Sequence, residues 1–350
     1  MKRNQSAVHQ LITYGMVIAA YILCQILVEN GSMTRSLKGQ LIPIAVYIVM
    51  AVSLNLTVGI SGELSLGHAG FMSVGAFSGI VVSQWMGTVY PNVHVYVRLV
   101  FAIVTGGIAA GIAGVLIGIP VLRLRGDYLA IVTLAFGEII RNIMNLLYVS
   151  VDQGRLRMAF NDGALPGEQV IAGPKGAVGI EKIATFTMGF ILVMITLFVV
   201  LNLINSRSGR AIMAIRDSRI AAESVGINVT KYKMMAFVIS SVLAGMAGAL
   251  FGLNYSTVSA GKFKFDMSIL VLVFVVLGGI GNIRGSVVAA TLLTILPELL
   301  RAFSDYRMLV YAVVLIVVML ASNSSLAGKL NQQYQMWLRA KRKKERGRAQ

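Results

Sequence analysis

Long apolar stretches alternate with short polar ones along most of this chain. Because about twenty apolar residues cross a bilayer as a helix, the pattern predicts ten membrane-spanning helices. These are residues 11–28, 41–60, 64–85, 99–119, 128–149, 183–204, 234–255, 268–283, 285–300 and 308–322. Only Arg284 separates the short eighth and ninth segments, so they form either two tilted spans or a re-entrant pair.

The predicted fold is all-α, a polytopic integral membrane helical bundle of about ten transmembrane helices. The pattern divides the chain into a cytoplasmic N-terminus at 1–10, a transmembrane domain at 11–322 and a basic cytoplasmic tail at 323–350. Within the transmembrane domain, glycine, proline and mixed charges at 150–182 indicate an ordered external loop rather than a helix. The loop at 205–233, on the cytoplasmic side, is the longest amphipathic interruption there.

Composition supports a membrane protein, because 57% of the residues are hydrophobic and only 13% are charged. A net charge of +17 would suggest nucleic-acid binding in a soluble protein, but here the charge lies between apolar segments and in the tail. Placing both termini on the cytoplasmic side of the cell membrane puts the basic loop at 205–233 inside, where lysine and arginine are enriched, and requires an even number of spans. The single cysteine, Cys24, lies in the first span, so no disulfide forms within the chain.

The fifth span carries polar residues on one helical face. Glu138, Arg141, Asn142 and Asn145 are spaced three or four apart in an otherwise apolar segment. An intramembrane charge is costly unless it is paired or hydrated, so we expect Glu138 and Arg141 to neutralise each other. Two interpretations stay open: a polar stripe beside a translocation path, or an ion pair that fixes the rotation of the helix.

Small residues also recur at a spacing of four, as at Gly107 and Gly111, which favours close helix packing within one bundle. His68 lies in a glycine-rich junction between the second and third spans and has no second metal ligand nearby in sequence, which favours a hydrogen-bonded histidine. The glycines at 278–285 resemble a phosphate loop but lack its Gly-Lys-Ser/Thr ending, so we interpret them as a helix-breaking turn. The sequence predicts no catalytic residue, cofactor or metal site, and therefore no enzyme.

The loop at 205–233 has the features of a short helix that binds a partner. Ser208 can cap a helix that starts near Gly209–Arg210 and ends at Gly226, about four turns in all. A helix that merely lies on the membrane surface is the alternative. The mixture of basic residues with Asp217, Glu223 and small alanines favours docking in the groove of a second protein.

Four blocks of sequence then resemble one family. The segment RAIMAIRDSRIAAESVGIN at 210–228 is similar to the cytoplasmic coupling loop of branched-chain amino acid ABC transporter permeases of the LivM type. GELSLGHAGF at 62–71, GDYLAIVTLAFGEIIR at 126–141 and VLGGIGNIRGS at 276–286 resemble the same family in the same order. AGPKGAVGI at 172–180 looks like its outer loop, although Glu181 stands where the family pattern has proline.

The resemblance implies a permease subunit of an importer for leucine, isoleucine and valine. It implies a second homologous permease (LivH type), two cytosolic ATP-binding subunits that hydrolyse ATP, and an extracytoplasmic amino-acid-binding protein. The ATPase-coupling helix would contain Arg210, Arg216, Asp217, Ala221, Ala222, Glu223 and Gly226. Candidate residues of the translocation path are Glu138, Arg141, Asn142, Asn145 and His68.

Three alternatives compete with this reading of the sequence. Relatives of the family are also associated with urea and short amides. A secondary transporter driven by an ion gradient would need intramembrane carboxylates as ion sites, whereas Glu138 is the only acidic residue deep in a span and has Arg141 beside it. A membrane scaffold would have no partner ATPase.

Overall fold

The computed structural model describes residues 2–31, 33–122, 128–152, 154–160, 165–301 and 306–323. They belong to two compact units, Met1–Ile295 and Leu296–Gln350. Most of the predicted tail at 323–350 lies outside the described residues. Helix α1 already begins at Lys2, so the predicted N-terminal segment at 1–10 is helical from that residue on.

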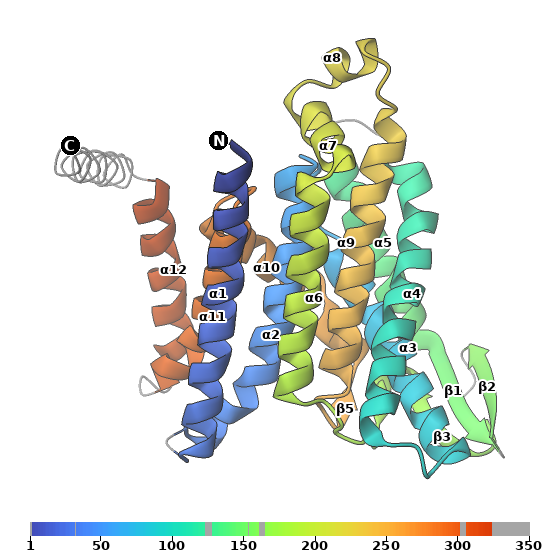
Figure 1. The fold of residues 1–350 in the computed structure, drawn as a ribbon. Coiled ribbons are helices and arrows are strands. Elements are labelled where there is room, and N and C mark those ends of the chain that lie inside the picture. Colours follow the sequence, from blue (N-terminus) through green and yellow to red (C-terminus); the bar gives the residue numbers. More distant parts are fainter. Residues whose placement is uncertain are drawn as a thin grey trace. The chain divides into compact units, whose positions relative to one another are not determined.

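Seven helices in the described part of the first unit are long and apolar enough to cross a membrane. They are α1 (Lys2–Glu29), α2 (Arg35–Asn55) with its π-helical extension η1 (Leu56–Ile60), α3 (His68–Val89), α4 (Val95–Val121), α5 (Tyr128–Leu146), α6 (Phe186–Asn205) and α9 (Val229–Gly252). The predicted polytopic helical bundle is therefore confirmed. The α7 and α8 helices lie at the end of the bundle where α1 begins, and the β-strands lie at the other end (Figure 1). We call these the α7 end and the sheet end.

The count of ten spans is not confirmed. The last three predicted spans correspond to shorter helices, which are α10 (Phe265–Gly278), α11 (Ile283–Leu299) and α12 (Arg307–Asn323), the last of them in the second unit. A turn joins α10 to α11, and its Gly279 and Gly281 have φ angles of 90° and 82°, which glycine adopts readily. The prediction of a helix-breaking turn at 278–285 is thus confirmed.

Helices α3, α4 and α9 form the core of the first unit, and glycines bring their backbones together. A methyl group on Gly75 of α3 would collide with the backbone of Gly245 in α9. One on Gly106 of α4 would lie 2.8 Å from the carbonyl oxygen of Gly75. The close helix packing expected from the small residues is therefore present, and it leaves no room for a larger side chain at these crossings.

A five-stranded antiparallel sheet covers the sheet end, in the order β2-β1-β3-β4-β5. Its strands are β1 (Leu147–Asp152), β2 (Arg155–Phe160), β3 (Glu168–Ala172), β4 (Ala177–Val178) and β5 (Thr257–Val258). The region 150–182 is ordered and holds no α-helix among its described residues, as predicted, but its strands were not foreseen. The fifth span is also shorter than predicted: α5 ends at Leu146, where the aromatic and β-branched run Tyr148–Val149–Val151 favours a strand.

An ion pair joins the region before α6 to the helical core. Glu181 forms a 2.9 Å ion pair with Nη1 of Arg98 at the start of α4. The other terminal nitrogen of Arg98 donates to the carbonyl oxygen of Ser83 in α3 at 3.1 Å. Glu181 therefore joins the sheet-end loop to the helical core through a charge contact.

Candidate functional site

Two short helices, α7 (Arg207–Asp217) and α8 (Arg219–Ser224), occupy the predicted coupling segment. The prediction of one four-turn helix capped by Ser208 is wrong. Ser206 caps α7, because its hydroxyl oxygen accepts the backbone N–H of Gly209 at 3.0 Å. Ser218 leaves helical geometry and its hydroxyl accepts the N–H of Ala221 at 3.3 Å, so it ends α7 and begins α8. Gly226, with a φ of 81°, follows α8 as predicted.

A small apolar cluster holds the two helices on α9. Ile215 of α7, Ala222 of α8 and Val229 of α9 are buried together, and Ile227 and Tyr232 pack against them. Ala222 is therefore an internal residue of this cluster, not part of the exposed surface. Burial of one apolar face fixes α7 and α8 relative to each other and leaves their opposite faces open.

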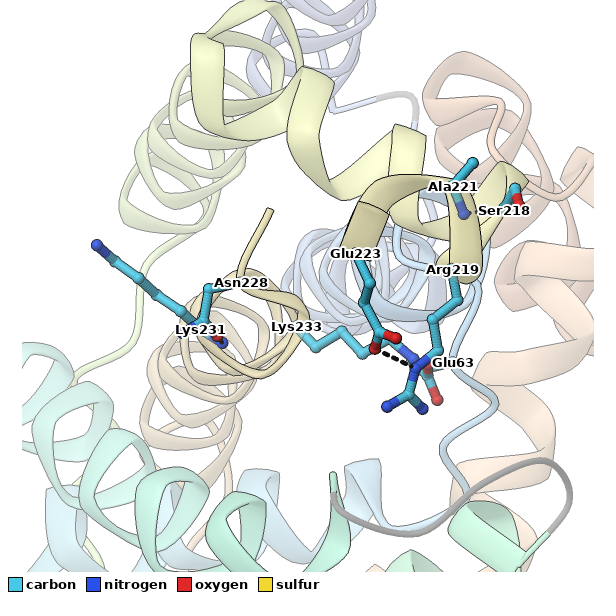
Figure 2. Close-up of polar contacts among 8 residues, drawn as sticks. All are labelled: Glu63, Ser218, Arg219, Ala221, Glu223, Asn228, Lys231 and Lys233. Carbon is cyan, nitrogen blue, oxygen red and sulfur yellow. Dashed lines mark hydrogen bonds and ion pairs between the residues drawn. The ribbon is translucent and has the colours of Figure 1, made fainter. Parts of the chain in front are cut away.

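The open face includes most of the predicted coupling residues. Arg210, Asp217, Ala221, Glu223 and Gly226 are all exposed. Arg219 donates from Nε to Oε1 of Glu223 at 2.9 Å, and the two side chains point toward each other along one side of α8 (Figure 2).

The sequence analysis missed two exposed apolar residues, Ile220 in α8 and Val225 directly after it. Ile220 is 82% exposed and Val225 is 74% exposed. Both residues lie near the Ala221–Ala222 pair in sequence. An apolar residue in such a position is more often on the buried face of a helix, so the pattern did not indicate that they are exposed. Exposed apolar side chains on a short projecting helix are typical of a protein-docking surface.

Arg216 connects α7 to the membrane helices rather than pointing away from them. Its Nη1 donates to the carbonyl oxygen of Gly59 in η1 at 3.0 Å, and its Nη2 donates to Oδ1 of Asp217 at 2.8 Å. The side chain also covers Gly62, where an added methyl group would lie 2.7 Å from Cγ of Arg216. Arg216 is thus a link between the coupling helices and the connection from α2 to α3.

A second link was not predicted. Lys233, at the start of α9, forms an ion pair with Glu63 in the same connection, and only 13% and 14% of these side chains are exposed. Figure 2 shows the Lys233 side chain reaching toward Glu63, below α8. The two residues are 170 positions apart in the chain, so no local pattern relates them. We call Gly59, Gly62 and Glu63 with their partners Arg216 and Lys233 the α7-end tethers.

The α7-end tethers continue toward α10 and α11 through one buried side chain. Asn55 is fully buried, and its Oδ1 accepts the backbone N–H of Gly281 at 2.8 Å. Its Nδ2 donates to Oγ of Ser286 at 2.8 Å. Gly59 packs against Gly281, since a methyl group on Gly59 would collide with the Gly281 backbone. The α10–α11 turn and the coupling helices therefore contact the same short segment of the chain.

The predicted polar stripe is present on α5. Arg141 donates from Nε to Oε2 of Glu138 at 2.7 Å, which confirms that the two charges neutralise each other. Both side chains are only half-buried, Asn142 is exposed and Asn145 is partly exposed. Only 17% of α5 is buried within the described structure, so the stripe lies on a largely uncovered helix.

His68 lies apart from that exposed stripe. It is 2% exposed, and its Nε2 lies 2.8 Å from Oγ of Ser53 in α2. Ser53 in turn donates to the carbonyl oxygen of Met50 at 3.0 Å. The expectation of a hydrogen-bonded histidine is confirmed, and its place in a translocation path stays a prediction. Among the described residues, no group of three or more His, Cys, Asp or Glu side chains is arranged to hold a metal ion.

Comparison with known proteins gives consistent matches. Residues 37–319 match the family model described as the permease component of the branched-chain amino acid transport system. The chain is 34% identical over 290 residues to the high-affinity branched-chain amino acid transport system permease protein LivM of Salmonella typhimurium and to that of Escherichia coli. Each alignment covers 79% of this chain and 66% of the relative, so the chain spans just under two thirds of the length of these relatives.

A second kind of permease is also similar. The permease protein LivH of the same Escherichia coli system is 31% identical over 126 residues, which are 35% of this chain and 41% of LivH. No solved structure matches the chain.

Proposed function

The chain belongs to the family of branched-chain amino acid transport permeases, and we propose that it is one permease subunit of an ATP-driven importer of leucine, isoleucine and valine. In this proposal the chain pairs with a second homologous permease, two cytosolic ATP-binding subunits and an extracytoplasmic binding protein. The α7 end faces the cytoplasm and the sheet end faces outward. In this proposal ATP is hydrolysed by the partner subunits.

The observation that carries the proposal is the projecting pair α7–α8 with its tethers. Ile220 and Val225 offer exposed apolar side chains to a soluble partner. Arg216 and Lys233 join the same region to Gly59 and Glu63 in the connection from α2 to α3. If a partner ATPase binds α8 and then closes, the tethers would move the ends of α2 and α3. Such a movement is needed to switch the bundle between outward and inward access.

The translocation path is proposed to lie along α5. Its half-exposed ion pair and its two asparagines are too polar to face lipid, because intramembrane charges require protein or water around them. A water-filled space between this subunit and the second permease would meet that need. Asn142 and Asn145 then supply hydrogen-bonding groups next to the moving substrate.

The two transporter alternatives differ in what they predict. A carrier of urea or short amides would use the same architecture, so substrate competition separates it from the amino-acid importer. An ion-coupled transporter needs a carboxylate that gains and loses a proton or cation, and the contact with Arg141 at 2.7 Å disfavours that role for Glu138.

The test is co-expression of the chain with a second permease, ATP-binding subunits and binding protein, followed by reconstitution in vesicles. We expect ATP-dependent uptake of radiolabelled leucine that excess isoleucine or valine, but not urea or acetamide, suppresses. The double change Ile220→Ser and Val225→Ser is expected to reduce the co-purified ATPase about tenfold or more, because apolar anchors dominate such interfaces.

Val178→Ser is the matched control, since Val178 is an exposed apolar residue at the sheet end. It should leave the amount of ATPase unchanged. Uptake driven by an ion gradient without ATP, or a wild-type complex that contains no ATPase, would refute the proposed function.

A further inference from the structure

Helix α5 ends well short of the sheet end of α3. The two helices are level near Gly70 of α3 and Gly137 of α5, where an added methyl group on Gly70 would lie 3.0 Å from Cα of Gly137. From this level α5 continues only to Leu146, about 14 Å, whereas α3 continues to Val89, about 29 Å, at 1.5 Å per residue. Helix α3 is a candidate membrane span over its full length. About half of its length therefore has no helix α5 beside it.

The β1–β2 hairpin occupies that remaining depth. Strand β1 follows α5 directly, and the hairpin turn reaches the end of α3, where Nε1 of Trp85 donates to the carbonyl oxygen of Gly154 at 2.8 Å. Tryptophan and tyrosine mark the boundary between membrane and water, and Trp85 and Tyr90 stand together here. The hairpin therefore runs beside the sheet-end half of α3 (Figure 1). Because α3 is a candidate membrane span over its full length, we infer that the hairpin lies at membrane depth.

Strand β2 is the uncovered part of this hairpin. Among the strands that the structure describes, it pairs with β1 alone, so about half of its N–H and C=O groups point away from the sheet. Non-helical backbone at membrane depth is tolerated only against protein or water, because lipid leaves those groups without partners. Arg155 is exposed, and Arg157 keeps 51% of its side chain exposed although it pairs with Asp152 at 2.9 Å, so neither side chain suits lipid.

The side chains on the two faces of β2 indicate which environment covers the strand. Leu156, Met158 and Phe160 are exposed on one face, and Arg155 and Arg157 are exposed on the other. Lipid suits the first face only and bulk water suits the second only. A protein surface satisfies both, together with the free backbone edge.

We propose that β2 forms part of the surface against which the second, homologous permease subunit packs, and that the free edge of β2 forms backbone hydrogen bonds with that subunit. The inference rests on the proposed function, because it requires the second permease. It places the contact between the two subunits at the sheet end on a strand, whereas the helices carry the contact deeper in the membrane.

The test uses photo-crosslinking in membranes that contain the complete transporter. p-Benzoylphenylalanine replaces Phe160 of β2 or, as a matched control, Phe198 of α6, two phenylalanines that are 65% and 61% exposed. We expect irradiation to link position 160 to the second permease and position 198 to lipid, with about tenfold more subunit crosslink at 160. Equal crosslinks at both positions, or links from position 160 to lipid or binding protein only, would overturn the inference.

A second variant tests the same surface without a crosslinker. Phe160→Asp is expected to reduce the second permease recovered with the tagged chain about tenfold, while Phe198→Tyr leaves it unchanged. Recovery of the second permease at wild-type level with Phe160→Asp would contradict the inference alone. Failure of the wild-type chain to recover a second permease would instead contradict the proposed function.

Discussion

The glycine-packed core of α3, α4 and α9 and the α7-end tethers hold parts of the first unit together in different ways. In the core, backbones touch through Gly75, Gly106 and Gly245 with no side chain between them. At the α7 end, two polar contacts, from Arg216 to Gly59 and from Lys233 to Glu63, join segments that otherwise have few contacts. Backbone packing has no alternative arrangement of similar energy, whereas polar tethers can be exchanged for others. The difference indicates a rigid centre and an end built to move.

The largest effect is expected from filling a core crossing. Gly245→Val places methyl groups against Ala110 and the backbone of Gly106, where overpacking costs about 3 kcal/mol or more. We expect the subunit to lose most of its thermal stability in detergent, as measured by size-exclusion chromatography after heating. Gly15→Val in α1, where nothing lies within 4 Å, is the control and should behave like the wild type. A stable Gly245→Val protein would show that the core is looser than its geometry indicates.

A smaller effect is expected from breaking the ion pair at the α7 end. Lys233→Met leaves the mostly buried carboxylate of Glu63 without its partner, which costs about 2 to 3 kcal/mol because the pair retains some exposure. We expect the complex to assemble but to import less leucine per ATP hydrolysed. The exchanged pair Glu63→Lys with Lys233→Glu should recover part of this coupling. Unchanged coupling in Lys233→Met would mean that this tether does not transmit motion.

The smallest effects separate two arginines of the coupling segment. Arg216→Gln removes the hydrogen bond to Gly59, worth about 1 kcal/mol, whereas Arg219→Gln removes only a surface pair worth about 0.5 kcal/mol or less. We expect hydrogen exchange in the α2–α3 connection to become faster in Arg216→Gln and to stay unchanged in Arg219→Gln. Equal exchange rates in the two variants would show that the Arg216–Gly59 hydrogen bond does not stabilise the α2–α3 connection.

The sequence predicted the helices well because a bilayer imposes a length that apolar runs reveal directly. It also predicted that Glu138 and Arg141 pair, since their spacing alone brings them together. It did not predict the break at Ser218, because a serine inside a helical pattern is compatible with either a continuing helix or a new cap. The strands after Leu146 were missed for a related reason: a short apolar run continues a membrane helix as readily as it begins a strand.

The contacts of the α7-end tethers could not be predicted from the sequence for a different reason. Glu63 and Lys233 are 170 residues apart, and nothing in either segment indicates the other. The family resemblance located the coupling segment but not its orientation, so Arg216 was listed among the ATPase-coupling residues and its hydrogen bond to Gly59 was not foreseen. Local patterns report which face of a helix is apolar, whereas the partner of a polar side chain depends on how distant segments pack.

The pairing of β4 with β5 also bears on how the protein is made. Val178 pairs with Thr257, and α6, α7, α8 and α9 lie between them in the chain. A chain emerging from the ribosome therefore cannot complete its sheet until two further membrane helices have been inserted and the chain has returned to the same side. Until then β4 has an open edge, which is a surface that chaperones and proteases recognise. Closure by β5 thus requires that the chain through α9 has been inserted, before α10 and α11 follow.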